Sequence, residues 1–267
     1  MGVGEVAVGG AFYEEVGEGV FASGAATAGP WSAKLQHGGP PSALLGWAME
    51  RYRPREGLRI ARVTVELVRA VPVADLRVEV RTVRSGRRAE LLEGEIVCGG
   101  RTVALARAWR VVASPVDTPC LAPGLGVGRV RGVQPAAVMA GAHSEGYLAA
   151  MEWRFEGGGG FDVPGPGVVW ARQRIPLLAG CSDTPLTRAL VLADSSWAVA
   201  FELDHHRRFV INTDVTLLVH RDPVGSWLCL RSATAAAAQG SGLAEGVLAD
   251  EAGQCGRVLQ TLVVDER

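Results

Sequence analysis

An internal duplication is the sequence feature that most constrains the fold. A mostly apolar helical segment followed by a run of alternating segments occurs twice in the 267 residues. Strand ends in the two copies also correspond: VRAVPVADL at 68–76 matches VHRDPVGSW at 219–227, and GGRTVALA at 99–106 matches CGRVLQTL at 255–262. Alternation with period two is typical of strands that bury one face. The sequence therefore predicts two copies of one helix-and-sheet unit.

The first copy opens with LQHGGPPSALLGWAMERYR at 35–53. Pro40 and Pro41 suit the first turn of a helix, and the segment 42–53 is apolar on most sides, which predicts a largely buried helix that ends near Pro54. Four alternating segments follow and predict antiparallel strands, with hairpin turns at 85–86 and 99–100. These strands are expected at 59–72, 75–86, 89–100 and 101–112.

The second copy repeats this order. Its elements are expected as strands at 147–156 and 168–176, a helix at 184–203, and strands at 208–223, 225–240, 242–253 and 256–266. The stretch 114–146 is rich in Pro and Gly and lacks a clear period, so it is predicted to be a linker, and 157–167 to be a second loop. The predicted organisation is an N-terminal unit at 1–113, the linker at 114–146 and a C-terminal unit at 147–267.

Composition excludes several classes of protein. A hydrophobic content of 48%, a charged content of 21% and a net charge of −1 predict a soluble globular protein without general affinity for nucleic acid or membrane. The five cysteines include no CxxC pair, so neither a disulfide framework nor a zinc site is expected, and the cytoplasm is the expected compartment. No signal peptide or membrane span is predicted. Lys34 is the only lysine, which suggests a GC-rich coding sequence and a bacterial source.

Three stretches in this order resemble the thioesterase-like double hot-dog proteins, the group that includes acyl-CoA thioesterase II. They are HGGPPSALL at the first helix, LADSSWAVAFEL in the second, and INTDVTLLVHRDP followed by GRVLQTLVV. The resemblance covers nearly the whole chain apart from the linker. It implies an α+β fold of two fused hot-dog units, each a long antiparallel sheet wrapped around a central helix, and hydrolysis of acyl-CoA thioesters.

The resemblance also implies a set of catalytic residues. Family members hold the attacking water with an Asp on the second helix, a hydroxyl residue on the next strand and a Gln on the last strand. By motif, the Asp is Asp194 and the Gln is Gln260. The hydroxyl position falls on Asn212, with Thr213 beside it, which departs from the family pattern and leaves both as candidates.

The residues themselves give partial support to these assignments. Asp194 is expected in the middle of a buried helix, where a carboxylate needs a partner or a function, although a backbone or Arg contact would also explain it. Gln260 lies on a largely apolar strand, facing either inward or toward solvent. Aligning the two copies places Ala48 opposite Asp194 and Ala104 opposite Gln260, so only the second copy is predicted to carry the chemistry.

His37, Gly38 and Gly39 are predicted to bind substrate. Glycines at a helix entrance allow a thioester carbonyl to approach backbone N–H groups, where the helix dipole favours negative charge. The alternative is a tight turn that needs positive φ, with His37 as a surface cap. A catalytic His37 is less favoured, because a lone histidine is usually structural.

Several further residues are candidates for catalysis, substrate binding or metal binding. Ser195, Ser196 and Trp197 follow Asp194 directly; Ser195 and Trp197 are predicted to contact substrate, and no G-x-S-x-G motif favours a serine nucleophile. His205 and His206 are adjacent and fit a solvated helix end better than a metal pair. Cys181 has only weak grounds as a nucleophile.

No cofactor or metal is expected, since the chain lacks the P-loop, G-x-G-x-x-G, HExxH and EF-hand motifs. CoA would bind as part of the substrate, with arginines such as Arg207 or Arg208 near its phosphates.

The predicted function is hydrolysis of an acyl thioester, carried by CoA or by an acyl carrier protein, through a water activated by Asp194. Fatty acyl or polyketide metabolism is the expected context, and a homo-oligomer is a further expectation. Two alternatives stay open. One is a hot-dog dehydratase, hydratase or other secondary-metabolic enzyme. The other is a non-catalytic acyl-binding protein, in which Asp194 would be salt-bridged or exposed.

Overall fold

One continuous antiparallel sheet organises the protein. The computed structural model describes residues 10–113, 128–135, 139, 141–157, 160–200 and 208–266. Along the first half of the sheet the strands follow the order β1 (Tyr13–Gly17), β2 (Val20–Ser23), β6 (Leu76–Arg84), β7 (Ala89–Cys98), β8 (Arg101–Val112) and β5 (Leu58–Glu66). Along the second half they follow the order β12 (Asp214–Val219), β15 (Gly253–Glu266), β14 (Ser241–Asp250), β13 (Leu228–Ala236), β10 (Gly167–Gln173) and β9 (Met151–Phe155).

The strand order confirms the duplication. Reading outward from the centre, β5, β8, β7, β6, β2 and β1 on one side correspond to β12, β15, β14, β13, β10 and β9 on the other. The halves join where β5 pairs with β12, through the fully buried pairs Val65 with Val215 and Val63 with Leu217. A separate two-stranded sheet is formed by β3 (Ala28–Gly29) and β4 (Ser32–Gln36), after a short 3₁₀ turn at Ala25–Thr27.

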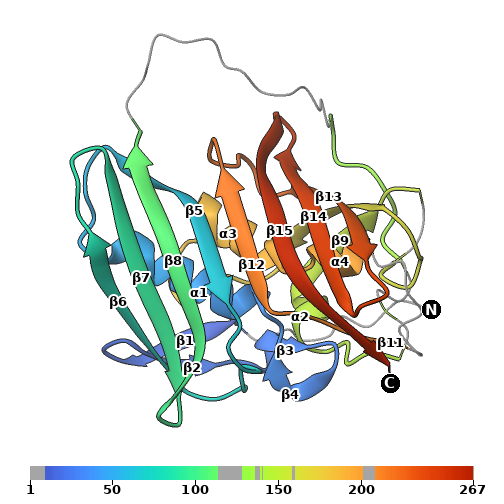
Figure 1. Ribbon diagram of the computed structural model, residues 1–267, viewed down its shortest axis with the longest axis horizontal. Helices are drawn as coiled ribbons and strands as arrows, with labels where there is room; N and C mark the ends of the chain where they lie inside the picture. Colours follow the sequence, from blue (N-terminus) through green and yellow to red (C-terminus); the bar gives the residue numbers. More distant parts are fainter. Residues whose placement is uncertain are drawn as a thin grey trace.

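Two central helices lie against the same face of this sheet (Figure 1). Helix α1 (Gly39–Arg51) carries both prolines in its first turn, as expected, and α3 (Pro185–Ala193) begins with a capping box at Thr184. The helices pack closely because Gly46 has no side chain: a Cβ there would lie 2.3 Å from Leu190 Cδ1. This close crossing brings the end of each helix near the beginning of the other.

Buried Arg110 on β8 closes the C-terminal end of α1. Its guanidinium group donates to the carbonyl oxygens of Met49, Tyr52 and Arg53, which a helix end leaves without partners. It also forms a buried ion pair with Glu90 at 3.0 Å. The sheet therefore stabilises a helix end that Pro54 also favours in the sequence.

Three predicted elements differ from the structure. The helix expected at 184–203 ends at Ala193, and a separate short helix, α4 (Ser196–Val199), follows; 201–203 lie outside the described residues. The expected strand 147–156 begins as a helical turn, α2 (Tyr147–Ala150), before β9. The expected strand 208–223 is divided into β11 (Arg208–Asn212) and β12. In each case the apolar or alternating sequence pattern continues where the backbone changes direction, so the pattern does not reveal the break.

The hairpin turn at Gly99 and Gly100 is confirmed, with positive φ at both residues. The predicted linker is described only in part, because 114–127 lie outside the described residues. Within its later portion, Val133 exchanges backbone hydrogen bonds with Phe155 of β9. No helix in the described ranges is long and apolar enough to cross a membrane.

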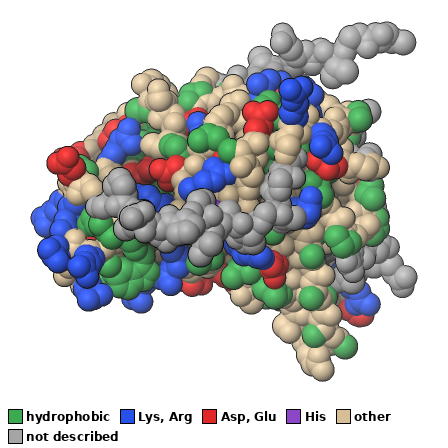
Figure 2. All heavy atoms as spheres, turned by 90° about the horizontal axis from the view of Figure 1, so that it is seen from above, with side chains coloured by type: hydrophobic (Ala, Val, Ile, Leu, Met, Phe, Trp, Pro, Cys, Tyr) green, Lys and Arg blue, Asp and Glu red, His purple; other side chains and the backbone are tan. Residues whose placement is uncertain are grey.

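On the face seen in Figure 2, positive and negative side chains are interspersed, and Lys and Arg side chains gather at its left end.

Candidate active site

A buried carboxylate, Asp194, lies immediately after the last residue of α3. It is only 3% exposed. Its Oδ1 accepts hydrogen bonds from Asn212 Nδ2 at 2.8 Å and from Gln260 Nε2 at 3.3 Å. Its Oδ2 lies 3.3 Å from His37 Nδ1. The structure thus brings together four of the residues that the sequence singled out, from four separate segments of the chain.

Asp194 is at the end of the helix and not in its middle, as the sequence had suggested. The N–H of Ser195 donates to the Leu192 carbonyl at 2.9 Å, which tightens the chain into a turn. The turn directs the carboxylate toward the beginning of α1 instead of along the side of α3.

A register shift selects Asn212 over Thr213. Asn212 pairs with Leu262 of β15, whereas Thr216 pairs with Leu259, so one extra residue is inserted between β11 and β12. Asn212 consequently faces inward and is 7% exposed. Thr213 is exposed and its hydroxyl donates to Asp214 at 3.3 Å. Thr213 is therefore outside the cluster, which corrects its inclusion among the catalytic candidates.

Gln260 faces inward on β15 and is 1% exposed. Its Oε1 accepts the backbone N–H of Trp197 at 3.0 Å, and its Nε2 donates to the backbone carbonyl of Asp194 at 3.2 Å. Because the Trp197 N–H needs an acceptor, only one orientation of the amide satisfies these contacts. The side chain therefore connects the start of α4 to the carboxylate.

Neither Gly38, which precedes α1, nor Gly39, its first residue, has positive φ, so the turn interpretation of HGG is wrong in that respect. Gly38 has φ of −67°. Both glycines are required by close approach: a Cβ on Gly38 would lie 2.7 Å from Asp194 Oδ2, and one on Gly39 would lie 2.2 Å from the Val191 carbonyl oxygen. The missing side chains allow the carboxylate to reach the entrance of α1.

His37 is half-buried and not a surface cap, since its side chain is 11% exposed. Its Nδ1 lies 3.1 Å from the Gly39 N–H as well as beside Asp194. One ring nitrogen cannot accept the first contact and donate to the second at the same time. Burial lowers the pKa of His37, although the Asp194 charge partly opposes this, so the neutral imidazole is favoured.

Tyr147 is a member of the cluster that the sequence did not reveal. Its ring stacks on His37, with centroids 3.7 Å apart and planes 6° from parallel. Its hydroxyl contacts the Val191 carbonyl at 2.8 Å and Ser195 Oγ at 3.0 Å. Burial raises the pKa of Tyr147 far above its usual range, which keeps the phenol neutral. The only sequence signal was a polar aromatic residue at the end of the Gly-rich stretch.

The residues after Asp194 have different surroundings. Ser195 is buried against Tyr147, while the hydroxyl of Ser196 lies 2.9 Å from that of Ser232. The Trp197 ring packs among Val210, Ala244 and Leu262 and stacks on half-exposed Trp31, with centroids 6.2 Å apart. Ser195 and Trp197 therefore adjoin the cluster, and Ser196 faces away to β13.

A second carboxylate lies where the helices cross at their other ends, although the alignment of Ala48 with Asp194 agrees with the helix starts, which follow Gly38 and Thr184. Asp194 ends α3 and lies against Gly38, just before α1. Glu50 is at the end of α1, and its Oε2 accepts from Thr184 Oγ1, just before α3, at 2.7 Å. The crossing of the helices thus places one of these two carboxylates at each end of the helix pair.

Other candidates do not join the cluster. His205, His206 and Arg207 lie outside the described residues, and Arg208 pairs with Glu266 at 2.7 Å. Cys181 is a free, half-buried thiol that packs on the core. The described residues contain no group of three or more His, Cys, Asp or Glu side chains that could hold a metal ion.

Comparison with known proteins identifies the family. The model of the acyl-CoA thioesterase N-terminal domain matches residues 27–111, and that of the acyl-CoA thioesterase C-terminal domain matches 131–264. The search of curated proteins finds no match.

Solved structures with the same fold include a protein assigned as a thioesterase from Novosphingobium aromaticivorans, with a TM-score of 0.72, 18% identity, and coverage of 94% of this chain and 98% of that one. A protein assigned as thioesterase II from Thermobifida fusca has a TM-score of 0.69 and 16% identity, with 95% of each chain covered. Acyl-CoA thioesterase II from Mycobacterium marinum has a TM-score of 0.65 and 13% identity, with 96% of this chain and 95% of that one covered.

The two family models together span most of the sequence, and the structure has the matching pair of units; the chain belongs to the acyl-CoA thioesterase family of double hot-dog proteins and is a thioester hydrolase.

Proposed function

We propose that the protein hydrolyses an acyl-CoA thioester with a water molecule that Asp194 activates. The observation that carries the proposal is the environment of this carboxylate. It is buried, forms no ion pair with Lys or Arg in the described part of the chain, and is held by the amides of Asn212 and Gln260. A buried carboxylate without a compensating cation is costly to fold, so a chemical role accounts for it better than a structural one.

In this mechanism Asp194 takes a proton from water as the water oxygen bonds to the thioester carbonyl carbon. The C–S bond of the resulting tetrahedral intermediate then breaks, and the electron pair leaves with sulfur. The proton held by Asp194 passes to that thiolate, which yields a free thiol and a carboxylic acid. One carboxylate thus acts first as base and then as acid.

The amides would fix the reacting geometry. Asn212 also donates to the Asp214 carbonyl at 3.1 Å, so both of its N–H groups have partners and its Oδ1 remains an acceptor for the water. Gln260 is fixed by its bond from the Trp197 N–H. Such positioning lowers the activation barrier, because the water and the carboxylate are already oriented and lose little further entropy in the reaction.

The entrance of α1 would stabilise the oxyanion. Pro40 and Pro41 have no N–H, and the Gly39 N–H is directed to His37 Nδ1. The N–H of Gly38 makes no hydrogen bond with any described residue, and it lies at the positive end of the helix dipole. It is therefore the donor that we assign to the developing negative charge. Ser195 and Trp197 would line the path of the substrate beside it.

The test is release of free thiol from acyl-CoAs of short to long chain by the wild type, Asp194→Asn and the exposed control Asp75→Asn. We expect Asp194→Asn to lower kcat by at least about 100-fold with its circular dichroism spectrum unchanged, because the general base is lost. Asp75→Asn should match the wild type. Full activity of Asp194→Asn would show that another group activates the water. If the wild type is inactive on every acyl-CoA, an acyl carrier protein is the substrate carrier to test next.

A further inference from the structure

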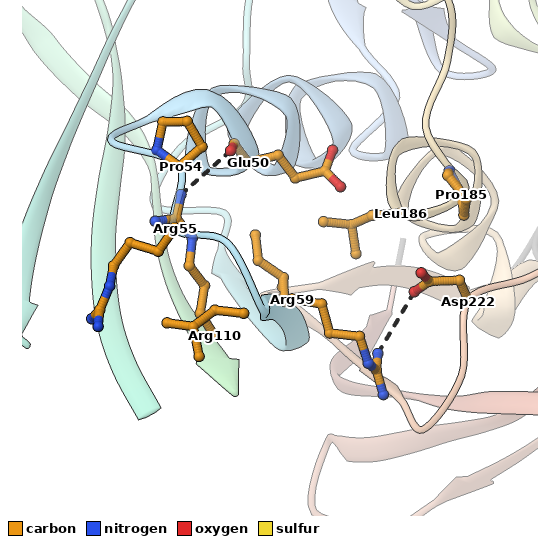
Figure 3. Close-up of a pocket in the computed structure, with 10 residues that line it drawn as sticks. Glu50, Pro54, Arg55, Arg59, Arg110, Pro185, Leu186 and Asp222 are labelled. Atoms are coloured by element: carbon orange, nitrogen blue, oxygen red, sulfur yellow. Dashed lines mark hydrogen bonds and ion pairs between the residues drawn. The ribbon is translucent and has the colours of Figure 1, made fainter. Parts of the chain in front are cut away.

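A cavity lies at the ends of the two central helices that are remote from the Asp194 cluster. It has a volume of about 190 Å³ and is lined by residues from the end of α1, the start of α3 and β5 (Figure 3). Glu50 directs its carboxylate into it from α1, toward Leu186 of α3 (Figure 3). The cavity lies at the end of the helix pair opposite to the Asp194 cluster.

The surroundings of Glu50 differ from those of Asp194. Asp194 is surrounded by Asn212, Gln260 and His37. Glu50 has one side-chain contact, from the Thr184 hydroxyl, and forms no ion pair among the described residues. Its Oε1 is therefore an acceptor without a donor in the described part of the chain.

The arginines around the cavity are already occupied. Arg110 donates to Glu90 and to the end of α1, and Arg55 donates to the Gly86 carbonyl at 2.9 Å and lies 3.7 Å from Glu90. Arg59 donates to the His220 carbonyl at 2.6 Å and lies 3.6 Å from Asp222. Glu50 is therefore the lining carboxylate that contacts no arginine among the described residues, while the other lining carboxylate, Asp222, lies beside Arg59.

The remaining walls are apolar, from Pro54, Leu58, Ile60, Pro185 and Leu186. A complementary ligand therefore combines a cationic hydrogen-bond donor with a short apolar body. We propose that this cavity is a second ligand site that binds a small primary ammonium ion, with the ammonium group on Glu50 and the alkyl tail against these walls.

Glu50 must be ionised to bind a cation. Burial raises its pKa, its bond from Thr184 and the charges of Arg51 and Arg110 lower it, and Asp222 raises it further. An alkylammonium ion remains charged up to about pH 10. Affinity should therefore fall as pH decreases through the raised pKa of Glu50.

The experiment is isothermal titration calorimetry of the full chain with n-butylammonium chloride at pH 8, with butan-1-ol and sodium butyrate as matched probes of the same tail. We expect saturable binding of butylammonium only, and a loss of at least about tenfold in affinity for Glu50→Gln. Glu56→Gln, an exposed acid nearby, should bind like the wild type.

Three results would overturn the proposal: no binding of butylammonium, tighter binding of butyrate, or equal affinity of Glu50→Gln and wild type. If Glu50→Gln does not fold, the affinity of the wild type for butylammonium is measured from pH 8 to pH 4 instead. An affinity that does not change with pH would also reject a role for Glu50. The test measures binding without turnover, so its result is independent of the function proposed for Asp194.

Discussion

At the scale of single residues, the candidate site depends on neutral groups that hold a charged one. The Asp194 carboxylate accepts hydrogen bonds from two side-chain amides. His37 and Gly38, at the start of α1, lie on its other side. The two amides fix the position of Oδ1, and His37 and Gly38 lie against Oδ2. The geometry therefore makes separate predictions for adjacent residues that a sequence alone would treat alike.

Asn212 and Thr213 form a matched pair for substitution. Asn212→Ala removes the shortest contact to Asp194 and should lower kcat/KM about 10- to 100-fold through loss of positioning. Thr213→Ala removes an exposed hydroxyl and should leave kcat/KM within about twofold of the wild type. Steady-state thiol release measures both. A larger effect for Thr213→Ala than for Asn212→Ala would contradict the register shift between β11 and β12.

His37 should make stability depend on pH. Burial lowers its pKa in the folded protein, so below its unfolded value of about 6.5 the unfolded chain binds more protons. Its contribution is complete above that pH and is lost as pH falls through the lowered pKa of the folded state. The slope is at most about 1.4 kcal/mol per pH unit, the limit for one proton.

Denaturation with urea between pH 8 and pH 5 checks this dependence, with His37→Gln as the comparison. The variant should show a flatter decline below pH 6.5 than the wild type. His220, whose pKa is also lowered by partial burial, contributes equally to both proteins. Identical slopes would mean that the pKa of His37 does not differ between the folded and unfolded states.

At the scale of elements, the ends of the helices are set by groups outside them. Helix α3 ends because the chain turns at Asp194 and Ser195, and α1 ends where Arg110 satisfies its last carbonyls. Apolar character continues past the end of α3 in the sequence, whereas the charged residues and Pro54 already end the apolar run of α1. Packing therefore decides where α3 stops, and it reinforces an end that the sequence of α1 predicts.

Arg110→Met should strongly destabilise the protein. It leaves Glu90 buried without its closest partner and removes the donors at the end of α1, at a cost of about 3–5 kcal/mol in the free energy of unfolding. Arg107→Met, which breaks the exposed contact to Glu93, should cost less than about 1 kcal/mol. Chemical denaturation measures both values. The double variant Arg110→Met/Glu90→Leu should recover part of the loss, and no recovery would show that capping outweighs the unpaired charge.

At the scale of the whole molecule, the two halves are one sheet. β5 and β12 pair across their junction, and the candidate site takes His37 and Gly38 from the first half and Asp194, Asn212 and Gln260 from the second. Neither half contains the complete cluster. Stability and chemistry therefore both require the junction.

The halves should unfold together. Because the buried pair Val65 and Val215 lies inside a continuous sheet, separating the halves would expose apolar surface on both. Differential scanning calorimetry should show one transition, with calorimetric and van't Hoff enthalpies in agreement. Two resolved transitions would mean that each hot-dog unit is stable alone.

The sequence by itself determined the duplicated plan. Apolar periodicity reports which side of an element is buried, so it was sufficient to predict both helices, the hairpin at Gly99 and Gly100, and the antiparallel strands of the first copy. Resemblance to a family added Asp194 and Gln260. Their side chains meet because one follows α3 and the other faces inward on β15.

Only the tertiary structure decided the rest, because contacts between distant segments have no local pattern. A one-residue shift against β15 chose Asn212 over Thr213, and the stack with His37 recruited Tyr147. The crossing of α1 and α3 brought Glu50 beside Thr184 and Asp194 beside Gly38. Register and crossing depend on how whole surfaces fit together, so they become fixed only when the two halves pack around the helices.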